Sequence, residues 1–211
     1  MRLLTGIETR VLPTDWQRSL RVRRLRQAVA RANPLNVILG AGGTSYPGWL
    51  PTDGDVLEIT SRRDWERLFE PESIDHLLAE HVIEHLSQEE ARRAFTACFC
   101  YLKPGGLFRL AVPDGYRRDE IYLSEASPPK DGHQALYNVD SMTNLLRASG
   151  FETTPLEYFD RNEEFHALPW DECDGFIQRS VRFDRQKDFQ RENVFYTSLI
   201  IDARKPVRAN S

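Results

Sequence analysis

The densest group of side chains able to do chemistry lies between residues 81 and 85. His81 and His85 flank Glu84 in the spacing H-x-x-E-H, and on a helix two histidines spaced in this way lie one turn apart. Zinc hydrolases use such a pair as metal ligands and need a third ligand from another element. In this chain the motif directly follows an apolar strand and precedes a helix cap at Ser87. We therefore expect no metal here, and keep a zinc hydrolase using His81, Glu84 and His85 as a less favoured alternative.

A glycine-rich turn, Gly40-Ala41-Gly42-Gly43, follows a short apolar strand and is a second candidate site. Glycines in such a turn let the backbone approach a ligand closely. A dinucleotide site would also need a helix that begins at once and an acidic residue about 20 positions later. Here Pro47 and Gly48 prevent the helix, and Asp53 comes only 11 positions after Gly42. The turn therefore suits a nucleoside ligand without a pyrophosphate.

Short apolar strands alternate with amphipathic helices along the chain, which predicts an α/β fold with an open, mainly parallel, Rossmann-like sheet. The clearest helix covers residues 87–102, where Ser87 and Glu90 form a capping box. Another helix is expected to be capped by Asp140 and to end at Gly150. The other predicted helices are residues 19–32 and 62–69, and the predicted strands are residues 35–39, 48–53, 55–59, 74–79, 107–112, 153–159 and 194–202.

The composition limits the function classes that the chain can serve. Its 211 residues suit one domain, and its net charge of −4 argues against a dedicated nucleic-acid binder. No apolar stretch approaches the ~18 residues of a membrane span, and the N-terminal residues lack a signal peptide's features, so a cytoplasmic protein is expected. The 3 cysteines form neither a disulfide framework nor a four-ligand metal pattern. Arginines around the first helix predict a solvated face or, less favoured, a patch for an anionic partner.

Four stretches together resemble the class I S-adenosylmethionine-dependent methyltransferases, close to their short type 11-like members. They are LNVILGAGG (35–43), GWLPTD (48–53), SIDHLLAEHVIEHL (73–86) and YLKPGGLFRLAVPDG (101–115), of which the last two are the most specific. The resemblance implies one methyltransferase-like domain over residues 1–211, with an N-terminal extension at 1–34 and a cofactor-binding half at 35–113.

The implied cofactor is S-adenosyl-L-methionine. Asp53 would bind the ribose hydroxyls, because paired acceptor oxygens suit a vicinal diol. Glu58 and Ile59 would contact the adenine, and Glu80 and His81 would lie beside the methionine end. The full set of cofactor-binding residues that the resemblance implies is Gly40, Ala41, Gly42, Asp53, Glu58, Ile59, Glu80 and His81.

The chain departs from the family pattern two positions before the first glycine. The family usually has an acidic or polar residue there, and this chain has Ile38. The departure keeps open an alternative of another class, a methyltransferase-like binding or scaffold protein without turnover.

The family topology makes the last strand antiparallel, in a hairpin with residues 153–159. Two long loops, residues 114–139 and 160–193, then meet at the carboxyl edge of the sheet and are expected to form the acceptor pocket. Their mixture of rings and charges predicts a small polar acceptor, methylated at oxygen or nitrogen, and neither nucleic acid nor a membrane as partner. The expected catalytic candidates are His133, His166 and Asp114. The sequence predicts no oligomeric state.

Overall fold

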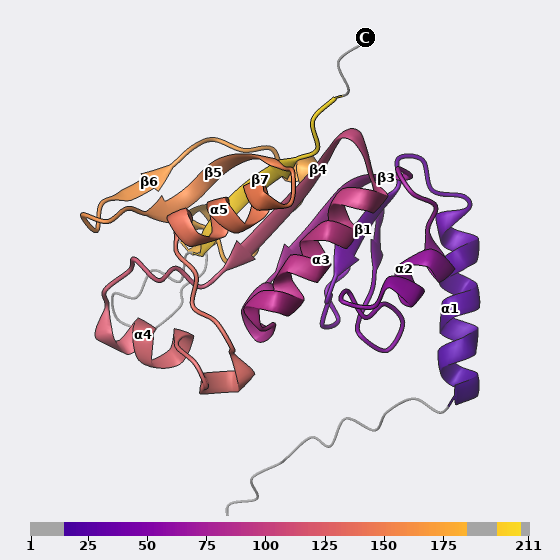
Figure 1. The fold of residues 1–211 in the computed structure, drawn as a ribbon, viewed down its shortest axis with the longest axis horizontal. Helices are drawn as coiled ribbons and strands as arrows, with labels where there is room; N and C mark the ends of the chain where they lie inside the picture. Colours follow the sequence, from indigo (N-terminus) through magenta and orange to yellow (C-terminus); the bar gives the residue numbers. More distant parts are fainter. Residues whose placement is uncertain (1–14, 185–197, 208–211) are drawn as a thin grey trace, which may run out of the picture.

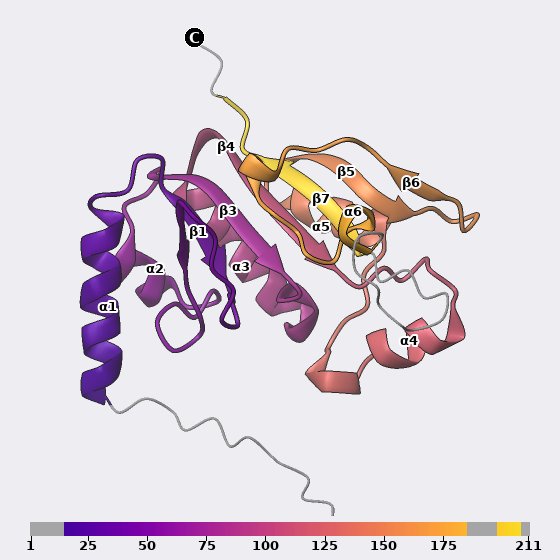
Figure 2. The same cartoon turned by 180° about the vertical axis from the view of Figure 1, so that it is seen from behind.

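The computed structural model describes residues 15–184 and 198–207. Within these ranges seven strands form one sheet in the order β2-β1-β3-β4-β7-β5-β6 (Figure 1, Figure 2). The first four strands of this order are parallel, whereas β7, β5 and β6 run antiparallel to their neighbours. The predicted α/β class and the antiparallel last strand are therefore confirmed. The strands are β1 (Asn36–Leu39), β2 (Trp49–Pro51), β3 (Ile74–Glu80), β4 (Leu102–Val112), β5 (Glu152–Phe159), β6 (Phe165–Ala167) and β7 (Leu199–Arg204).

Most helices begin where the sequence supplies a side-chain cap. Ser87 and Glu90 form the predicted capping box of α3. Asp140, however, is not the cap of α5: the cap is Asn138, two residues earlier, which forms a reciprocal capping box with Ser141. The helices are α1 (Asp15–Val29), α2 (Arg62–Leu68), α3 (Gln88–Tyr101), α4 (Glu120–Ala126), α5 (Val139–Ala148) and α6 (Val181–Asp184).

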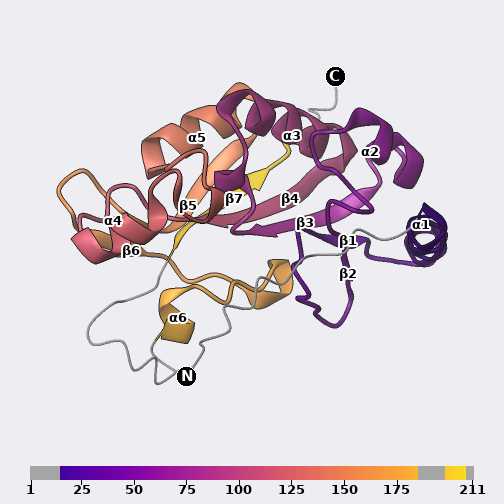
Figure 3. The same ribbon diagram turned by 90° about the horizontal axis from the view of Figure 1, so that it is seen from below.

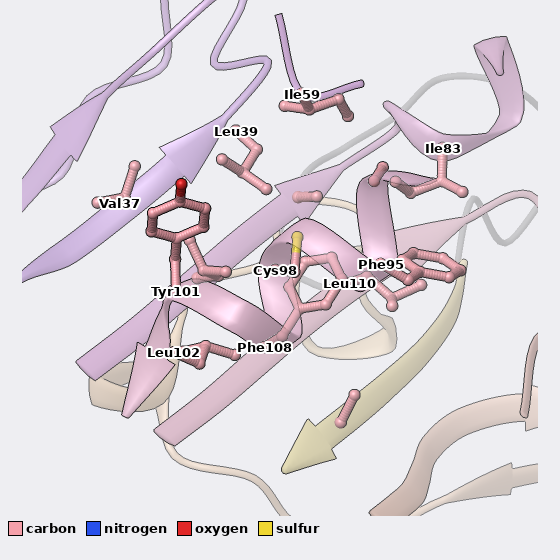
Figure 4. Packing of buried hydrophobic residues seen from close by; sticks show 14 of the residues in the cluster. Val37, Leu39, Ile59, Ile83, Phe95, Cys98, Tyr101, Leu102, Phe108 and Leu110 are labelled. Carbon is pink, nitrogen blue, oxygen red and sulfur yellow. The ribbon is translucent and has the colours of Figure 1, made fainter. Parts of the chain in front are cut away.

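One face of the sheet is covered by α2, α3 and α5 (Figure 3). The main core lies between these helices and the strands, where Phe95 and Cys98 of α3 lie over Phe108 and Leu110 of β4 (Figure 4). All four side chains are at most 1% exposed. This layer is an ordinary helix-on-sheet core and holds the strands in register.

The opposite face is covered in a different way. β1 and β2 are parallel neighbours, yet residues 40–48 between them contain no helix. Parallel strands are usually joined through a helix that covers a face of the sheet. Here residues 168–180, which include the 3-10 turn Glu172–Asp174, lie across this face (Figure 3). Ile177 is fully buried in a cluster that includes Ile38 and Leu78. A distant loop thus takes the place of a crossover helix.

Other expected elements also differ in the structure. Residues 55–59 form a turn and not a strand, because the backbone N–H groups of Val56 and Leu57 bond back to the Asp53 carbonyl. The expected strand at 194–202 is β7, with residues 194–197 outside the described ranges. The expected loop 160–193 contains β6, which pairs with β5, and its residues 185–193 are likewise not described.

Helix α1 lies at the β2 edge of the sheet (Figure 1) and is held there partly by polar contacts. It ends at Val29, earlier than the expected residue 32. Arg18 Nε donates to the Asp55 carbonyl at 2.7 Å, and Arg21 pairs with the Asp55 carboxylate. Among the helices within residues 15–184, none combines the length and apolar character that crossing a bilayer requires.

Candidate functional site

A cavity of about 160 Å³ lies at the carboxyl ends of β1 and β3. Gly40 and Ala41 line it from the turn after β1, and Glu80 and His81 line it from the end of β3. This is the edge at which open α/β sheets bind ligands. The structure therefore brings together four of the residues expected to bind a cofactor.

The glycine turn has a backbone that only glycine fits at its first position. Gly40 has φ +59°, and a Cβ placed on it would lie 2.6 Å from Cγ2 of Val82. The end of β2 holds the turn in place: Asp53 Oδ1 accepts a hydrogen bond from the Gly42 N–H at 2.8 Å, and Ala41 N–H donates to the Thr52 carbonyl at 2.8 Å. Gly42 and Asp53 are thus joined by this bond next to Ala41, and among the described residues neither of the two lines the cavity itself.

Glu80 uses both carboxylate oxygens to hold another segment over the cavity. Its Oε1 accepts from the Arg179 backbone N–H at 2.7 Å, and its Oε2 accepts from the Gln178 N–H at 3.2 Å. We name residues 175–180 the covering segment. Because Gln178 and Arg179 also line the cavity, this segment forms its outer wall.

Arg109 fixes the start of the covering segment. It is 1% exposed and makes a two-pronged ion pair with Asp202, with N–O distances of 2.7 and 2.9 Å. Its Nη1 donates to the carbonyls of Asp171 at 2.6 Å and Gly175 at 2.7 Å. Its guanidinium also lies over the Trp170 ring, 4.9 Å from the centroid. The sequence reasoning missed Arg109, although a charged residue inside the apolar strand LFRLAV was a usable signal.

His81 lines the cavity and has a strained backbone. Its φ is +55°, in the left-handed region that non-glycine residues rarely adopt. Its Nε2 lies 2.8 Å from the Ser198 hydroxyl, and its Nδ1 lies 2.8 Å from Glu84 Oε1. The residues after it, Ile83–His85, form a single 3-10 turn. The H-x-x-E-H motif therefore has no helix to place its two histidines one turn apart on one face.

Glu58 and Ile59 lie in the turn before α2. The Glu58 carboxylate accepts from the N–H and hydroxyl of Thr60 at 3.2 and 3.0 Å. Ile59 is buried, and its carbonyl accepts from Trp65 Nε1 at 2.9 Å. Glu58 and Ile59 are not among the described residues that line the cavity.

Asp114 is a buried residue that joins the loop after β4 to the end of β5. It is 1% exposed, and its oxygens accept from the Phe159 N–H at 2.7 Å and the Tyr116 N–H at 3.0 Å. Burial raises the pKa of Asp114 to about 6, while the N–H donors of Phe159 and Tyr116 and the charge of Arg117 act in the opposite direction.

The two expected histidines lie in different places. His133 lies beside His85, with ring centroids 4.9 Å apart. His166 lies on β6, stacked on Tyr158 and 3.0 Å from Asp160 Oδ2. Among the described residues, neither histidine nor Asp114 lines the cavity.

Residues 55–110 match a family model described as a methyltransferase domain. The chain is similar to the solved structure of an O-methyltransferase family protein from Burkholderia thailandensis, at 11% identity and a TM-score of 0.50, covering 92% of this chain and 57% of that chain. It is also similar to a SAM dependent methyltransferase from Archaeoglobus fulgidus, at 14% identity and a TM-score of 0.49, covering 89% and 94% of the two chains. No curated protein sequence matches the chain. At 11% identity the likeness to the Burkholderia protein establishes the fold alone.

Proposed function

We propose that this chain, which has the Rossmann-like fold of the S-adenosylmethionine-dependent methyltransferases and matches their domain model over residues 55–110, binds S-adenosyl-L-methionine and transfers its methyl group to a small polar acceptor. The observation that carries the proposal is the cavity between the turn after β1 and the end of β3. Its position agrees with the general rule for ligands of open α/β sheets.

The charged and aromatic groups at the cavity suit this cofactor. The cofactor carries a sulfonium cation, which a carboxylate and an aromatic face stabilise. Glu80 and Tyr46 supply these groups in the cavity wall. Asp53 holds the glycine turn through its Oδ1, and we propose that the same carboxylate accepts the ribose hydroxyls.

The covering segment must shift when the cofactor binds. Sites for ligands of this size are typically about 300–1,000 Å³, whereas the cavity holds about 160 Å³. Gln178 and Arg179 line the outer wall, so displacing them enlarges the space directly. We propose that the two bonds from Glu80 release when the cofactor enters.

The chain's contribution to the reaction is alignment. When bound, the cofactor supplies a methyl group already activated by its cationic leaving group. Holding nucleophile, methyl and sulfur in line can contribute about 7–11 kcal/mol. A hydroxyl acceptor would also need a base. We keep His133, His166 and Asp114 as candidates and add His81, because it is the histidine that lines the cavity among the described residues.

The proposal is tested by a structure with S-adenosylhomocysteine bound, together with an assay of S-adenosylhomocysteine release on a panel of hydroxyl and amine acceptors. We expect the product in the cavity between Gly40 and Glu80, with the covering segment displaced. Product bound elsewhere, or an unliganded crystal at saturating product, would contradict the site. A methyl-side cavity lined only by aliphatic groups would contradict the polar acceptor.

A second candidate function, a scaffold without turnover, is favoured by one observation. An open groove of about 880 Å³ runs along α1 and is lined by Arg18, Arg23, Arg26 and Arg67. Such a groove suits an acidic partner segment. If an acidic peptide binds the wild-type protein but not an Arg23→Glu/Arg26→Glu variant, and no acceptor yields product, the scaffold function is favoured over the enzyme.

A further inference from the structure

Glu84 is a buried carboxylate whose position is not explained by the cofactor cavity. It is 1% exposed, and neither of its oxygens has a hydrogen-bond partner of acceptable geometry among the described residues. His81 Nδ1 lies 2.8 Å from Oε1, a contact that becomes an ion pair only when the ring is protonated, and Oε2 has no partner among the described residues. An unsatisfied buried carboxylate is costly to a folded protein, so the site calls for a cation.

Two histidine rings lie beside this carboxylate. One nitrogen of His85, one nitrogen of His133 and one oxygen of Glu84 lie within 4.8 Å of one another. His85 is exposed and His133 is half-buried, so the cluster opens to solvent on one side. A metal ion could therefore reach the buried carboxylate of Glu84 from the solvent side, past His85.

His133 is held in the form that a metal ligand needs. Its Nδ1 lies 2.7 Å from the Ala126 carbonyl oxygen. Because a carbonyl only accepts, Nδ1 must carry the proton, and in the neutral ring Nε2 then presents a lone pair. Histidine ligands of metals commonly donate their other ring nitrogen to a carbonyl in this way.

Two hydrogen bonds from Gln134 to backbone carbonyls join the two parts of the cluster, although these parts are far apart in the sequence. Gln134 N–H donates to the Glu84 carbonyl at 2.7 Å, and the Gln134 side-chain amide donates to the His85 carbonyl at 2.7 Å. The segment that bears His133 is thus fixed against the segment that bears Glu84 and His85. The three side chains are therefore held near one another without a bound ion.

We propose that Glu84, His85 and His133 bind a divalent transition-metal ion of the zinc class. Two imidazoles and one carboxylate are the donors that such ions prefer, whereas magnesium prefers oxygen donors alone. Three protein ligands leave at least one coordination position for water or another oxygen donor. The set differs from the H-x-x-E-H motif, because His133 and not His81 completes it.

The geometry needs only a small contraction. A point equidistant from three atoms 4.8 Å apart lies ~2.8 Å from each, and zinc–ligand bonds are ~2.0–2.2 Å long, so each atom moves inward by at most ~0.8 Å. Rotation of the exposed His85 side chain provides part of this movement. The distance is therefore compatible with a site that closes on its ion.

A second cluster, formed by Asp160, Glu164 and His166, has no buried carboxylate without hydrogen-bond partners. Asp160 already accepts from the backbone N–H groups of Asn162 at 2.8 Å and Glu164 at 3.0 Å, and from His166 at 3.0 Å. Its carboxylate is therefore satisfied without an ion, and Glu164 is exposed. His166 is accordingly a matched control for the test.

The test is calorimetric titration of chelator-treated full-length protein with zinc chloride, and with magnesium chloride in parallel. We expect one zinc per chain, a higher melting temperature with zinc, and weaker binding by at least ~100-fold in His85→Ala and His133→Ala. His85 is exposed, so its variant reports on binding without loss of a packed side chain. His166→Ala should bind zinc as the wild type does.

The proposal stands apart from cofactor binding, because the titration contains no S-adenosylmethionine. It is overturned if the wild type binds no zinc at concentrations up to ~1 mM, or if His85→Ala and His133→Ala bind as tightly as the wild type. It is also overturned if only His166→Ala loses the zinc, or if magnesium binds as tightly as zinc. Circular dichroism melting of each variant without metal excludes loss of fold as the cause.

Discussion

The Glu80 carboxylate accepts a hydrogen bond of 2.7 Å from the backbone N–H of Arg179, a residue 99 positions away in the sequence. This bond joins the end of β3, which borders the proposed cofactor cavity, to the segment that covers it. Ile177, two residues earlier, is fully buried against the same face of the sheet. Access to the cavity is therefore governed by how firmly this segment is held.

Glu80→Gln should loosen the covering segment without unfolding the protein. The substitution removes the negative charge that strengthens both bonds to the Gln178 and Arg179 N–H groups, and bonds to a charged acceptor contribute about 1.5–3 kcal/mol. We expect hydrogen exchange of these two amides to become at least ~10-fold faster. Mass spectrometry of peptides covering residues 175–180 measures this exchange, and Glu152→Gln, at an exposed position of β5, is the control. Unchanged exchange in Glu80→Gln would show that the bonds do not hold the segment.

Arg109→Met should destabilise the domain strongly and free the start of the covering segment. Removing the guanidinium leaves Asp202 without its two-pronged partner and the carbonyls of Asp171 and Gly175 without a donor. Removal of one partner of a buried ion pair lowers the free energy of unfolding by about 3–5 kcal/mol. Urea denaturation of the variant measures the loss, and Arg204→Met on the more exposed end of β7 is the control. A loss below ~1 kcal/mol would contradict this role of Arg109.

Asp114 should make the protein less stable as the pH rises from 4 to 7. The folded pKa, about 6, is above the ordinary value of 3.8, so the folded state binds the proton more tightly than the unfolded state. This contribution is complete below pH 3.8 and is lost as the pH passes through 6. Between pH 4 and 7 it amounts to about 2 kcal/mol.

The control for the predicted pH dependence is Asp114→Asn, in which the side chain has nearly the same shape as aspartate but cannot ionise. We expect the free energy of unfolding of the wild type to fall by about 2 kcal/mol relative to the variant between pH 4 and 7. Denaturant titrations at several pH values measure the difference. A pH-independent difference between the two proteins would mean that the Asp114 pKa is not raised.

The parts of the fold that depend on local signals were predictable from the sequence. The capping box at Ser87 and Glu90 placed α3, and Pro47 with Gly48 correctly indicated that no helix follows the glycine turn. The cap of α5 was assigned to Asp140 in place of Asn138, because two polar residues compete at that boundary and only their geometry decides.

The long-range parts of the site could not be predicted in the same way. Hydrophobic periodicity does not show which distant loop covers a face of the sheet that lacks a crossover helix. The burial of Ile177 and the hydrogen bonds that Glu80 accepts from the covering segment could therefore not be predicted. The same holds for the surroundings of His133, because no local pattern shows that the fold places its ring against His85. The proposed cation beside His133 could be inferred only from the structure, because the structure shows that the buried carboxylate of Glu84 has no hydrogen-bond partner among the described residues.

The central claim, that S-adenosylmethionine binds at the carboxyl ends of β1 and β3, is tested most directly by calorimetric titration of the full chain with S-adenosylhomocysteine. We expect one site per chain with a Kd below ~100 µM, weakened at least ~10-fold by Asp53→Ala, which removes both the bond to Gly42 and the proposed ribose acceptor. Glu152→Ala should bind as the wild type does. No heat of binding with product or cofactor at ~1 mM, in a wild-type protein that melts cooperatively, would contradict the claim.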